Sequence, residues 1–522
     1  MMATTQRPID LDRLTLADVR DGALRGRPVT VLGLARSGIS LVRFFRDAGA
    51  LVTVYDGRAA AELSGALAEA ERASGASPIR LLAGPDVDPA DALAGAALVA
   101  TSPSINPDYP TTEPRLRAAL AALVAARRAG DPAVPAIVSE ADLFLRLCPA
   151  PPVGVTGTKG KTTTSALTAA VLSGDPSHPV ELGGNIGRPL VELLPSLTPA
   201  HRVVIELSEL QLPTLSRGTS VAVYTNVTSD HLDRHGSLDA YRRVKRRLAE
   251  LVDPAGALVL NVDDPIVATY AGLGGAAVVR YRAGEPPPGG LGVVDDWIVA
   301  AAVIRPAIAG GGSAVAPSSG PIVPLAELAI PGRHNVANAL AAVAVGLLFG
   351  VAPGAIRAAV GAFRGVEHRL ETVRIVDGVR FVNDSQGTQP DAVMAALRAF
   401  DGPIVLIAGG RDKGIDLAAL GPVVAERAAA AILIGESGPT LERLFRAAGL
   451  ARTERAATLE AAVERADLVA RALAAHGPAT VLLSPAAASF DMFEDYAARG
   501  RAFRSAVEDM ASRRAADTEA GR

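Results

Sequence analysis

Short apolar runs rich in valine, isoleucine and leucine alternate along the chain with longer stretches of helical spacing. Runs that end at glycine, proline or polar residues are typical of buried parallel strands, and the longer stretches are typical of the helices that cover them. The expected strands fall into three groups: 29–32, 51–55 and 98–100; 153–156, 203–206 and 221–226; 380–382, 404–407, 431–434 and 481–483. The pattern therefore predicts an α/β fold.

Three domains follow from this grouping, with bounds at 1–139, 140–366 and 367–522. The first and the last are expected to be Rossmann-like, and the central one to be of the P-loop ATPase type. Residues 284–290 and 309–321 are rich in glycine and proline and are expected to form loose surface segments. The apolar stretch 339–352 is too short to span a membrane and predicts a buried helix. The polar tail after Ser512 is expected to fray.

The composition excludes several classes of protein. Hydrophobic residues make up 49% of the 522 residues, which allows several cores and argues against disorder. A net charge of −3 argues against binding to nucleic acid or to an anionic membrane. Cys148 is the single cysteine, so an intrachain disulfide and a multi-cysteine metal site are excluded. Without a recognisable signal peptide or membrane span, we expect a cytoplasmic protein with no membrane insertion. We also expect a monomer, although no motif bears on the oligomeric state.

The basic residues are unevenly divided, because only four of the 52 are lysines: Lys159, Lys161, Lys245 and Lys413. Arginine and lysine share a charge but differ in chemistry. A lysine that persists in a chain that otherwise uses arginine is therefore a candidate for a role that arginine cannot take.

The strongest local signal is the glycine- and threonine-rich segment that follows the expected strand at 153–156. Its backbone amides can surround phosphate oxygens, and the N-terminus of the next helix adds positive potential. Lys161 would reach the β- and γ-phosphates of ATP, and Thr162 would offer a hydroxyl to Mg²⁺. A turn that binds nothing is the alternative. The predicted ATP-binding residues here are Gly157, Thr158, Lys159, Gly160, Lys161, Thr162 and Thr163.

Two side chains at the carboxyl ends of expected strands are candidates for a metal site beside this loop, because ligands of α/β proteins gather there. Glu206 ends the strand at 203–206, and its carboxylate is a hard ligand suited to Mg²⁺. His231 follows the strand at 221–226, although a surface or helix-capping histidine is the alternative.

Lys245 is one lysine among four arginines in the stretch 242–247 of an expected helix. Neighbouring cations disfavour the ammonium form of a lysine. A neutral amine can act as a nucleophile or take up CO₂ to become a carbamate, which would be an anionic metal ligand. A solvated basic face of the helix is the alternative.

Other strand ends indicate binding edges. Residues 33–38 partly match the dinucleotide-binding fingerprint, with Ala35 in place of its middle glycine, and Asp56 ends the next strand as a ribose-contacting acid does. In the third group, three polar segments each follow a strand and predict a shared binding edge, where Lys413 would pair with a carboxylate. These segments are 383–390, 408–414 and 484–491.

Taken together, these motifs resemble the bacterial Mur ligases over residues 29–503, nearly the whole chain. The motifs that carry the resemblance are GLARSGIS (33–40), TGTKGKTTT (156–164), GGNIGRPL (183–190), ELSELQL (206–212), NVTSDHLDRHGS (226–237), NVDD (261–264), GRHNVANALAA (332–342), EHRLE (367–371), NDSQGTQPDA (383–392), GGRDKG (409–414) and LSPAAASFDMF (483–493). The first and the last look like those of the branch that adds D-glutamate.

The resemblance implies an ATP-dependent ligase that adds D-glutamate to UDP-N-acetylmuramoyl-L-alanine in peptidoglycan synthesis. One domain would bind the UDP-sugar, one ATP and one glutamate. Thr162 and Glu206 would hold one Mg²⁺, and His231 and a carbamylated Lys245 would hold a second. Lys161, His231 and Lys245 would be the catalytic residues. The other implied contacts are Arg36, Ser37, Arg58, Ser102 and Asn185 for the UDP-substrate; Asn335, Asn338, Arg369 and Asp384 for the nucleotide; and Thr388, Lys413, Ser489 and Tyr496 for glutamate.

Four positions depart from the family pattern: Gln386, Glu209, Ser104 and Tyr496 stand where lysine, serine, glycine and phenylalanine are usual. The first two leave the stereochemistry of the amino acid open, because a related class of ligase adds L-glutamate. The sequence also leaves open a folylpolyglutamate synthase-like ligase and a nucleotide-binding regulator without catalysis.

Overall fold

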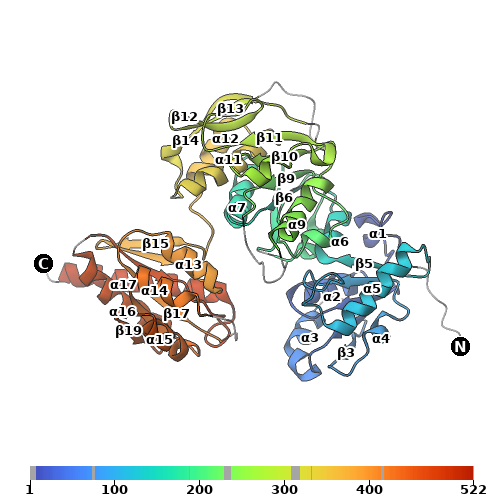
Figure 1. Ribbon diagram of the computed structural model, residues 1–522, viewed down its shortest axis with the longest axis horizontal. Coiled ribbons are helices and arrows are strands. Elements are labelled where there is room, and N and C mark those ends of the chain that lie inside the picture. Colours follow the sequence, from blue (N-terminus) through green and yellow to red (C-terminus); the bar gives the residue numbers. More distant parts are fainter. Residues whose placement is uncertain are drawn as a thin grey trace. The chain divides into compact units, whose positions relative to one another are not determined.

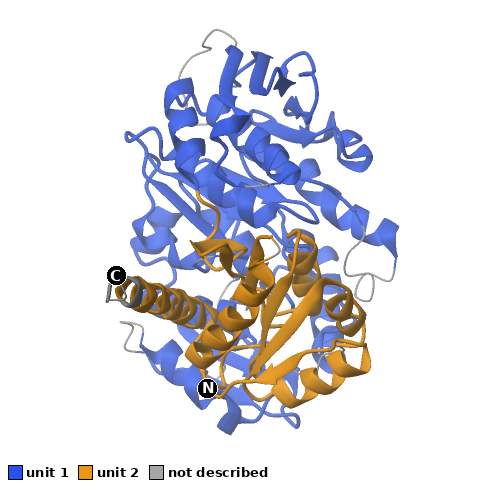
Figure 2. Cartoon of the chain, turned by 90° about the vertical axis from the view of Figure 1, so that its left-hand side faces the viewer, with its two compact units in different colours: residues 1–363 blue, residues 364–522 orange. Residues whose placement is uncertain are grey.

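The computed structural model of the chain forms two compact units, residues 1–363 and residues 364–522, which Figure 2 shows in different colours. The residues that it describes are 8–72, 77–186, 188–228, 237–306, 308, 318–330, 332–412, 417–475 and 477–520.

The first sheet of the 1–363 unit, drawn in blue to cyan in Figure 1, is parallel, with strand order β3-β2-β1-β4-β5. Strand β2 pairs with β1 on one side, and β4, which comes later in the chain, pairs with β1 on the other side. Such a reversal of the strand order opens a crevice at the carboxyl ends of the strands. Helix α2 packs on one face, whereas α4 and α5 pack on the other face with Leu32 and Tyr55. The elements are α1 (Leu16–Arg20), β1 (Pro28–Leu32), α2 (Arg36–Asp47), β2 (Leu51–Asp56), α3 (Ser64–Glu71), β3 (Arg80–Ala83), α4 (Pro89–Leu93), β4 (Leu98–Thr101), α5 (Pro114–Arg128), β5 (Ala136–Ser139) and α6 (Glu140–Leu147).

The second sheet of this unit has the order β14-β13-β12-β11-β10-β9-β6-β8-β7. Strands β6 to β11 are parallel, and β12, β13 and β14 extend the sheet as an antiparallel meander. The elements are β6 (Pro152–Thr156), α7 (Lys161–Leu172), β7 (Val180–Gly184), β8 (Arg202–Glu206), β9 (Val221–Tyr224), α9 (Leu238–Leu251), β10 (Ala257–Asn261), α10 (Pro265–Ala268), β11 (Ala277–Tyr281), β12 (Gly290–Val294), β13 (Trp297–Val303), β14 (Ser318–Pro324), α11 (Arg333–Leu348) and α12 (Pro353–Ala362).

Two hydrophobic clusters cover the faces of this second sheet. On one face α7, α11 and α12 pack together, and every residue of α11 from Ala339 to Leu348 is buried, which confirms the buried helix expected from the sequence. On the other face the cluster continues without a break into the core of the first sheet. The shared core explains why the two sheets form one compact unit.

One expectation about the loose segments was wrong, at the end of the stretch 309–321, of which residues 309–317 lie outside the described residues. Residues 318–321 form the start of β14 and pair with β13. The turn at 284–289 is held against β12, because the Val293 amide donates to the Gly284 carbonyl at 2.7 Å. Backbone pairing with β13 therefore outweighs the loop-like composition of residues 318–321, whereas residues 284–289 remain a turn at the surface.

The 364–522 unit contains one sheet with the order β15-β16-β20-β17-β18-β19, parallel except for the antiparallel pair β15 and β16. The tail expected to fray instead belongs to a helix that runs to Ala520, where Arg514 pairs with Asp467 and Asp377. The elements are β15 (Glu371–Val376), β16 (Val379–Asn383), α13 (Pro390–Arg398), β17 (Ile404–Gly409), α14 (Leu420–Arg427), β18 (Ala428–Ile434), α15 (Gly438–Ala447), β19 (Thr453–Arg455), α16 (Leu459–Ala474), β20 (Ala479–Leu483) and α17 (Tyr496–Ala520).

The expected α/β fold class is confirmed, with three sheets that are parallel over most of their width. Among the helices in the described part of the chain, none is long and apolar enough to cross a membrane.

Candidate functional site

The loop between β6 and α7 has the backbone shape that its glycines permit. Gly157 and Gly160 have φ angles of 148° and 85°, which favour glycine. A Cβ atom at Gly157 would lie 2.0 Å from Thr225 Oγ1, and one at Gly160 would lie 2.6 Å from Asn338 Oδ1. Helix α7 starts directly afterwards at Lys161, so its N-terminus faces the loop. This is the geometry of a phosphate-binding loop.

The loop is fixed from outside by the segment that follows β9. The Thr158 and Lys159 amides donate to the backbone and side-chain oxygens of Asn226, at 2.8 and 2.9 Å. Thr225 Oγ1 donates to the Lys159 carbonyl at 2.6 Å. These bonds engage backbone atoms of Lys159, while its side chain is exposed. The loop is thus held in shape by its neighbours in the sheet.

Lys161 and Lys245 both direct their amines at backbone oxygens of this loop. Lys161 Nζ donates to the Thr158 carbonyl at 2.8 Å, and Lys245 Nζ donates to the Gly157 carbonyl at 2.9 Å. Lys245 is completely buried in α9, and its Nζ lies 5.4 Å from the centre of the Tyr241 ring. The alternative of a solvated basic face is therefore wrong for Lys245, although its arginine neighbours are exposed or half-buried.

Glu206 places a carboxylate at the end of β8, the strand beside β6. The residue is 1% exposed, and its Oε1 accepts a hydrogen bond from Asn185 Nδ2 at 2.8 Å. Its buried Oε2 has no hydrogen-bond partner among the described residues. A buried carboxylate oxygen left unpaired is costly, so this atom fits a cation ligand.

The side chains near the phosphate loop suit Mg²⁺ as its ligands, because Glu206 and the buried hydroxyl of Thr162 supply hard oxygens. Within the described ranges no group of three or more His, Cys, Asp or Glu residues is placed to hold a metal. A magnesium ion there would thus also depend on ligand oxygens from outside this set, such as those of phosphate. His231, a predicted metal ligand, lies outside the described residues.

The two asparagines expected at the nucleotide pack against the phosphate-loop helix. Asn338 Oδ1 accepts a hydrogen bond from Thr164 Oγ1 at 3.1 Å, and its Nδ2 donates to Asn335 Oδ1 at 2.9 Å. Both residues are at least nine-tenths buried. The pair links α11 to α7 beside Gly160.

Four of the five residues expected at the UDP-substrate meet in one cavity of about 250 Å³, here called the Asn185 pocket. Arg36 and Ser37 come from α2, Ser102 follows β4, and Asn185 follows β7. The pocket is lined by Ala35, Arg36, Ser37, Ser102, Pro103, Ser104, Glu140, Gly184, Asn185, Pro189, Ser208, Leu210 and Gln211. Because Asn185 also bonds to Glu206, this cavity adjoins the carboxylate at the end of β8.

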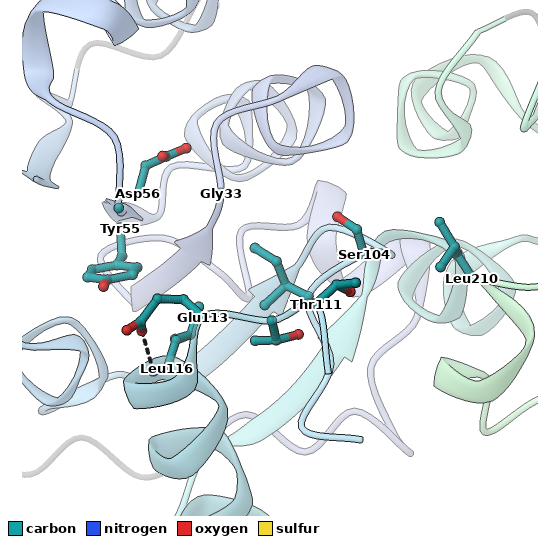
Figure 3. A pocket seen from close by; sticks show the side chains of 11 residues that line it. Gly33, Tyr55, Asp56, Ser104, Thr111, Glu113, Leu116 and Leu210 are labelled. Atoms are coloured by element: carbon teal, nitrogen blue, oxygen red, sulfur yellow. Dashed lines mark hydrogen bonds between the residues drawn. The ribbon is translucent and has the colours of Figure 1, made fainter. Parts of the chain in front are cut away.

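A second cavity of about 340 Å³, here called the Gly33 pocket, shares Ser104 and Leu210 with the first (Figure 3). Its lining is Gly33, Tyr55, Asp56, Gly57, Ser104, Ile105, Thr111, Thr112, Glu113, Leu116 and Leu210. Tyr55 has a buried hydroxyl without a hydrogen-bond partner among the described residues. Sequence reasoning missed Tyr55 and Glu113, because neither belongs to a motif.

Arg58, the fifth residue expected at the UDP-substrate, pairs with Asp56. Its Nη2 donates to Asp56 Oδ2 at 2.7 Å, and the Leu34 amide donates to the same oxygen at 2.9 Å. Burial alone would raise the pKa of Asp56, but these hydrogen bonds outweigh it and lower the pKa. Asp56 therefore shapes the 33–38 loop and holds Arg58.

Glu140 is a buried carboxyl in the wall of the Asn185 pocket, and it makes stability depend on pH. Burial raises its pKa to about 7, although hydrogen bonds from the Val191 and Leu190 amides oppose the shift. Because the folded pKa exceeds the unfolded value, Glu140 contributes stability below pH about 4.5 that is lost as pH rises through about 7.

We expect Glu140→Gln, which keeps an acceptor for the Val191 amide, to raise the melting temperature by a few degrees at pH 8. At pH 5 the increase should be much smaller. Thermal unfolding at both pH values checks this, and an equal shift at both would contradict the effect of burial.

In the 364–522 unit, Asp384 lies at the carboxyl end of β16. Ser484 Oγ donates to its Oδ2 at 2.7 Å, and burial raises the pKa of Asp384 to about 6. The exposed Arg369 contributes a charge that opposes this shift. Thr388 and Ser489 follow β16 and β20, two neighbouring strands, and Tyr496 starts α17. Lys413, the fourth residue expected at glutamate, lies outside the described residues.

Sequence reasoning also missed Arg499, which is 1% exposed on α17. Its guanidinium donates to the Ser385 carbonyl at 2.9 Å and to the Ala487 and Ala488 carbonyls at 3.2 Å each. Burial lowers its pKa to about 10. Arg499 thus ties the strand-end segments at 383–388 and 484–489 together. Abundant arginine hid it, because no local pattern separates it from exposed arginines.

The departures from the family pattern fall at distinct places. Gln386 Nε2 donates to the Glu367 carbonyl at 3.3 Å, and Glu209 is buried in the turn after β8. Ser104 lies between the two pockets of the first unit.

Comparison with known proteins assigns this architecture to a class of ligases. The family model described as Mur ligase middle domain matches residues 155–346, and the model described as Mur ligase, glutamate ligase domain matches residues 368–487. The chain belongs to the Mur ligase family, as its motifs suggested.

Two of its relatives are named UDP-N-acetylmuramoylalanine–D-glutamate ligase. That of Symbiobacterium thermophilum is 38% identical over 483 residues, which cover 92% of this chain and 97% of the relative. That of Anaeromyxobacter dehalogenans is 40% identical over 506 residues, which cover 94% and 99%. Among solved structures, the UDP-N-acetylmuramate–alanine ligase MurC of Thermotoga maritima aligns with a TM-score of 0.48 and 19% identity, over 92% of this chain and 99% of that one.

Proposed function

We propose that the protein is an ATP-dependent ligase that adds D-glutamate to UDP-N-acetylmuramoyl-L-alanine in peptidoglycan synthesis. The observation that carries this is the bond between Asn185 and Glu206. It joins a pocket for the UDP-substrate to a carboxylate beside the phosphate loop. Two relatives with the corresponding name, which align over more than nine-tenths of the chain, support the same reaction.

The two adjoining pockets suit an elongated UDP-sugar, since together they offer about the volume of a small-molecule site. The Arg36 guanidinium and the hydroxyls of Ser37 and Ser102 would contact its polar groups, with Asn185 at the reacting end and Arg58 near Asp56. In the second unit, Thr388, Lys413, Ser489 and Tyr496 would hold glutamate, while Arg369 and Asp384 would face the nucleotide. Under this proposal, the protein acts in the cytoplasm as a monomer.

The reaction proceeds in two displacements. The carboxylate of the UDP-substrate attacks the γ-phosphorus of ATP, the bond to the β–γ bridging oxygen breaks, and ADP leaves. The amine of D-glutamate then attacks the acyl carbon, and the tetrahedral intermediate loses phosphate and a proton to give the amide. The protein contributes mainly by positioning and by stabilising charge.

The chain's own residues serve the first step. The Lys161 ammonium and the loop amides that do not donate to Asn226 would hold the phosphates, with the hydroxyls of Thr162 and Thr163 at the start of α7. Thr162 and Glu206 would hold one Mg²⁺, and His231 with a carbamylated Lys245 a second. When bound, these ions neutralise charge on the phosphate oxygens.

The test is a phosphate-release assay with ATP, UDP-N-acetylmuramoyl-L-alanine and either enantiomer of glutamate, with the product identified by mass spectrometry. We expect turnover with D-glutamate and at least about 100-fold less with L-glutamate, since a misplaced amine loses its attack geometry. Turnover with L-glutamate alone would contradict the proposal and favour an L-glutamate-adding ligase, the alternative that Gln386 and Glu209 keep open. Acceptance of a folate substrate would favour the folylpolyglutamate synthase-like ligase. ATP binding without ligation would favour the nucleotide-binding regulator without catalysis.

A further inference from the structure

The segment between β4 and α5, residues 102–113, forms part of the wall of both pockets. It contains neither helix nor strand, yet it is held in one shape by its own hydrogen bonds. Thr112 Oγ1 accepts from the Asn106 amide at 3.1 Å and donates to the Asn106 carbonyl at 2.8 Å. The Tyr109 amide donates to the same carbonyl at 3.2 Å. We call this segment the 102–113 loop.

Tyr109 extends from this loop to a distant part of the chain. Its side chain is buried, and its hydroxyl donates toward the carbonyls of Glu209 and Leu210, at 3.3 and 3.2 Å. These carbonyls lie in the turn after β8, residues 207–212, which we call the β8 turn. A hydroxyl hydrogen shared between two carbonyls restrains both peptide groups.

The β8 turn supplies the opposite wall of the pockets. Leu210 lines both cavities, and Figure 3 shows it across from Ser104. Ser208 and Gln211 line the Asn185 pocket, where Gln211 Oε1 accepts from the Ser208 amide at 2.9 Å.

The same turn begins directly after Glu206 and is bonded to the strand that leads into the phosphate loop. The Leu207 amide donates to the Val155 carbonyl at 2.9 Å, and Thr156 Oγ1 donates to the Leu207 carbonyl at 2.8 Å. The β8 turn is thus held by hydrogen bonds at two places: Leu207 is bonded to β6, and the carbonyls of Glu209 and Leu210 are bonded to Tyr109.

We propose that Tyr109 is a positioning residue whose hydroxyl holds the β8 turn against the 102–113 loop, so that the two walls of the UDP-substrate pockets keep their spacing. The identity of the substrate rests on the proposed function. Loss of the hydroxyl leaves two carbonyls with one partner fewer in a buried place. The turn should then open more often, so part of the binding free energy of the substrate is used to order it.

The experiment compares Tyr109→Phe with the wild type and with Tyr270→Phe. Tyr270 is a matched control, because it is a buried tyrosine of the same unit whose hydroxyl donates to a backbone carbonyl, that of Arg242, at 3.4 Å. Hydrogen exchange is measured on the free proteins, since the amides of Gln211, Leu212 and Thr214 report on the turn. Affinity for UDP-N-acetylmuramoyl-L-alanine is measured by calorimetry without ATP, and steady-state kinetics give KM and kcat.

In Tyr109→Phe we expect about tenfold faster exchange at these three amides and about tenfold weaker binding of the UDP-substrate, because one buried hydrogen bond is lost. KM for the UDP-substrate should rise by a similar factor, with KM for ATP and the melting temperature close to those of Tyr270→Phe. Exchange equal to that of the control would overturn the proposal, as would faster exchange with unchanged binding. A wild type that does not bind the UDP-substrate would instead contradict the proposed function, and the exchange comparison would then decide the role of the hydroxyl.

Discussion

Lys245→Ala is expected to lower kcat by at least about 10³-fold, the scale of losing a group that stabilises charge in the transition state. The Lys245 amine lies 2.9 Å from the Gly157 carbonyl of the phosphate loop, and the residue is completely buried. A carbamate would form there by attack of the neutral amine on CO₂: the nitrogen–carbon bond forms, one carbon–oxygen π bond opens to give the carboxylate, and the amine loses a proton. The cation would then become an anionic ligand that acts with the predicted metal ligands Glu206 and His231.

Three variants distinguish the carbamate from simpler roles of Lys245. Lys245→Arg should stay inactive, because a guanidinium keeps the charge but forms no carbamate, and millimolar formate or acetate should partly restore Lys245→Ala. Arg243→Ala removes an exposed cation from the same helix and should retain activity within about twofold. Full activity of Lys245→Arg would exclude the carbamate. A carbamate signal in ¹³C NMR with labelled bicarbonate, lost in Lys245→Ala, would establish it without an activity assay.

The sequence was most informative where chemistry is local. Strand ends, the glycines at 157 and 160, and the apolar run of α11 are each set by neighbours in the chain, so pattern alone predicts them. Burial of Lys245 was not predictable in this way, because four surrounding arginines look like a solvated face. The surface on which it packs comes from β6 and the phosphate loop, almost a hundred residues earlier.

The same dependence on distant segments explains why some residues could not be predicted from the sequence. Tyr109 and Arg499 bond to segments far away in the sequence, as in the bonds from Tyr109 to residues about a hundred positions later, and Tyr55 lines a pocket whose other walls come from distant segments. Scarcity of lysine indicated candidate lysines, but it could not single out Arg499 among many arginines. Local motifs thus predicted the phosphate loop and four residues of the Asn185 pocket, whereas the walls that come from outside any motif depended on tertiary structure.

Lys161→Ala is expected to lower the rate of acyl-phosphate formation by at least about 10³-fold while the UDP-substrate still binds. Its ammonium lies at the N-terminus of α7 and touches the loop through the Thr158 carbonyl at 2.8 Å. The Asn185 and Gly33 pockets are lined by neither Lys161 nor any residue of α7, so their walls should survive the substitution. ADP release in single turnover gives the rate, and calorimetry gives the affinity for UDP-N-acetylmuramoyl-L-alanine, expected within about twofold of the wild type.

Lys159→Ala is the comparison variant, because it removes the same charge from another predicted ATP-binding residue of the same loop. The hydrogen bonds of Lys159 to Asn226 and Thr225 use its backbone atoms, which alanine retains, and its side chain is exposed. A smaller loss of rate is expected than for Lys161→Ala, because the Lys159 side chain is exposed whereas the Lys161 ammonium is bonded to the loop. Equal losses in the two variants would mean that overall positive charge, rather than the position of Lys161, drives the first displacement. Loss of UDP-substrate affinity in Lys161→Ala would contradict separate binding of the two substrates.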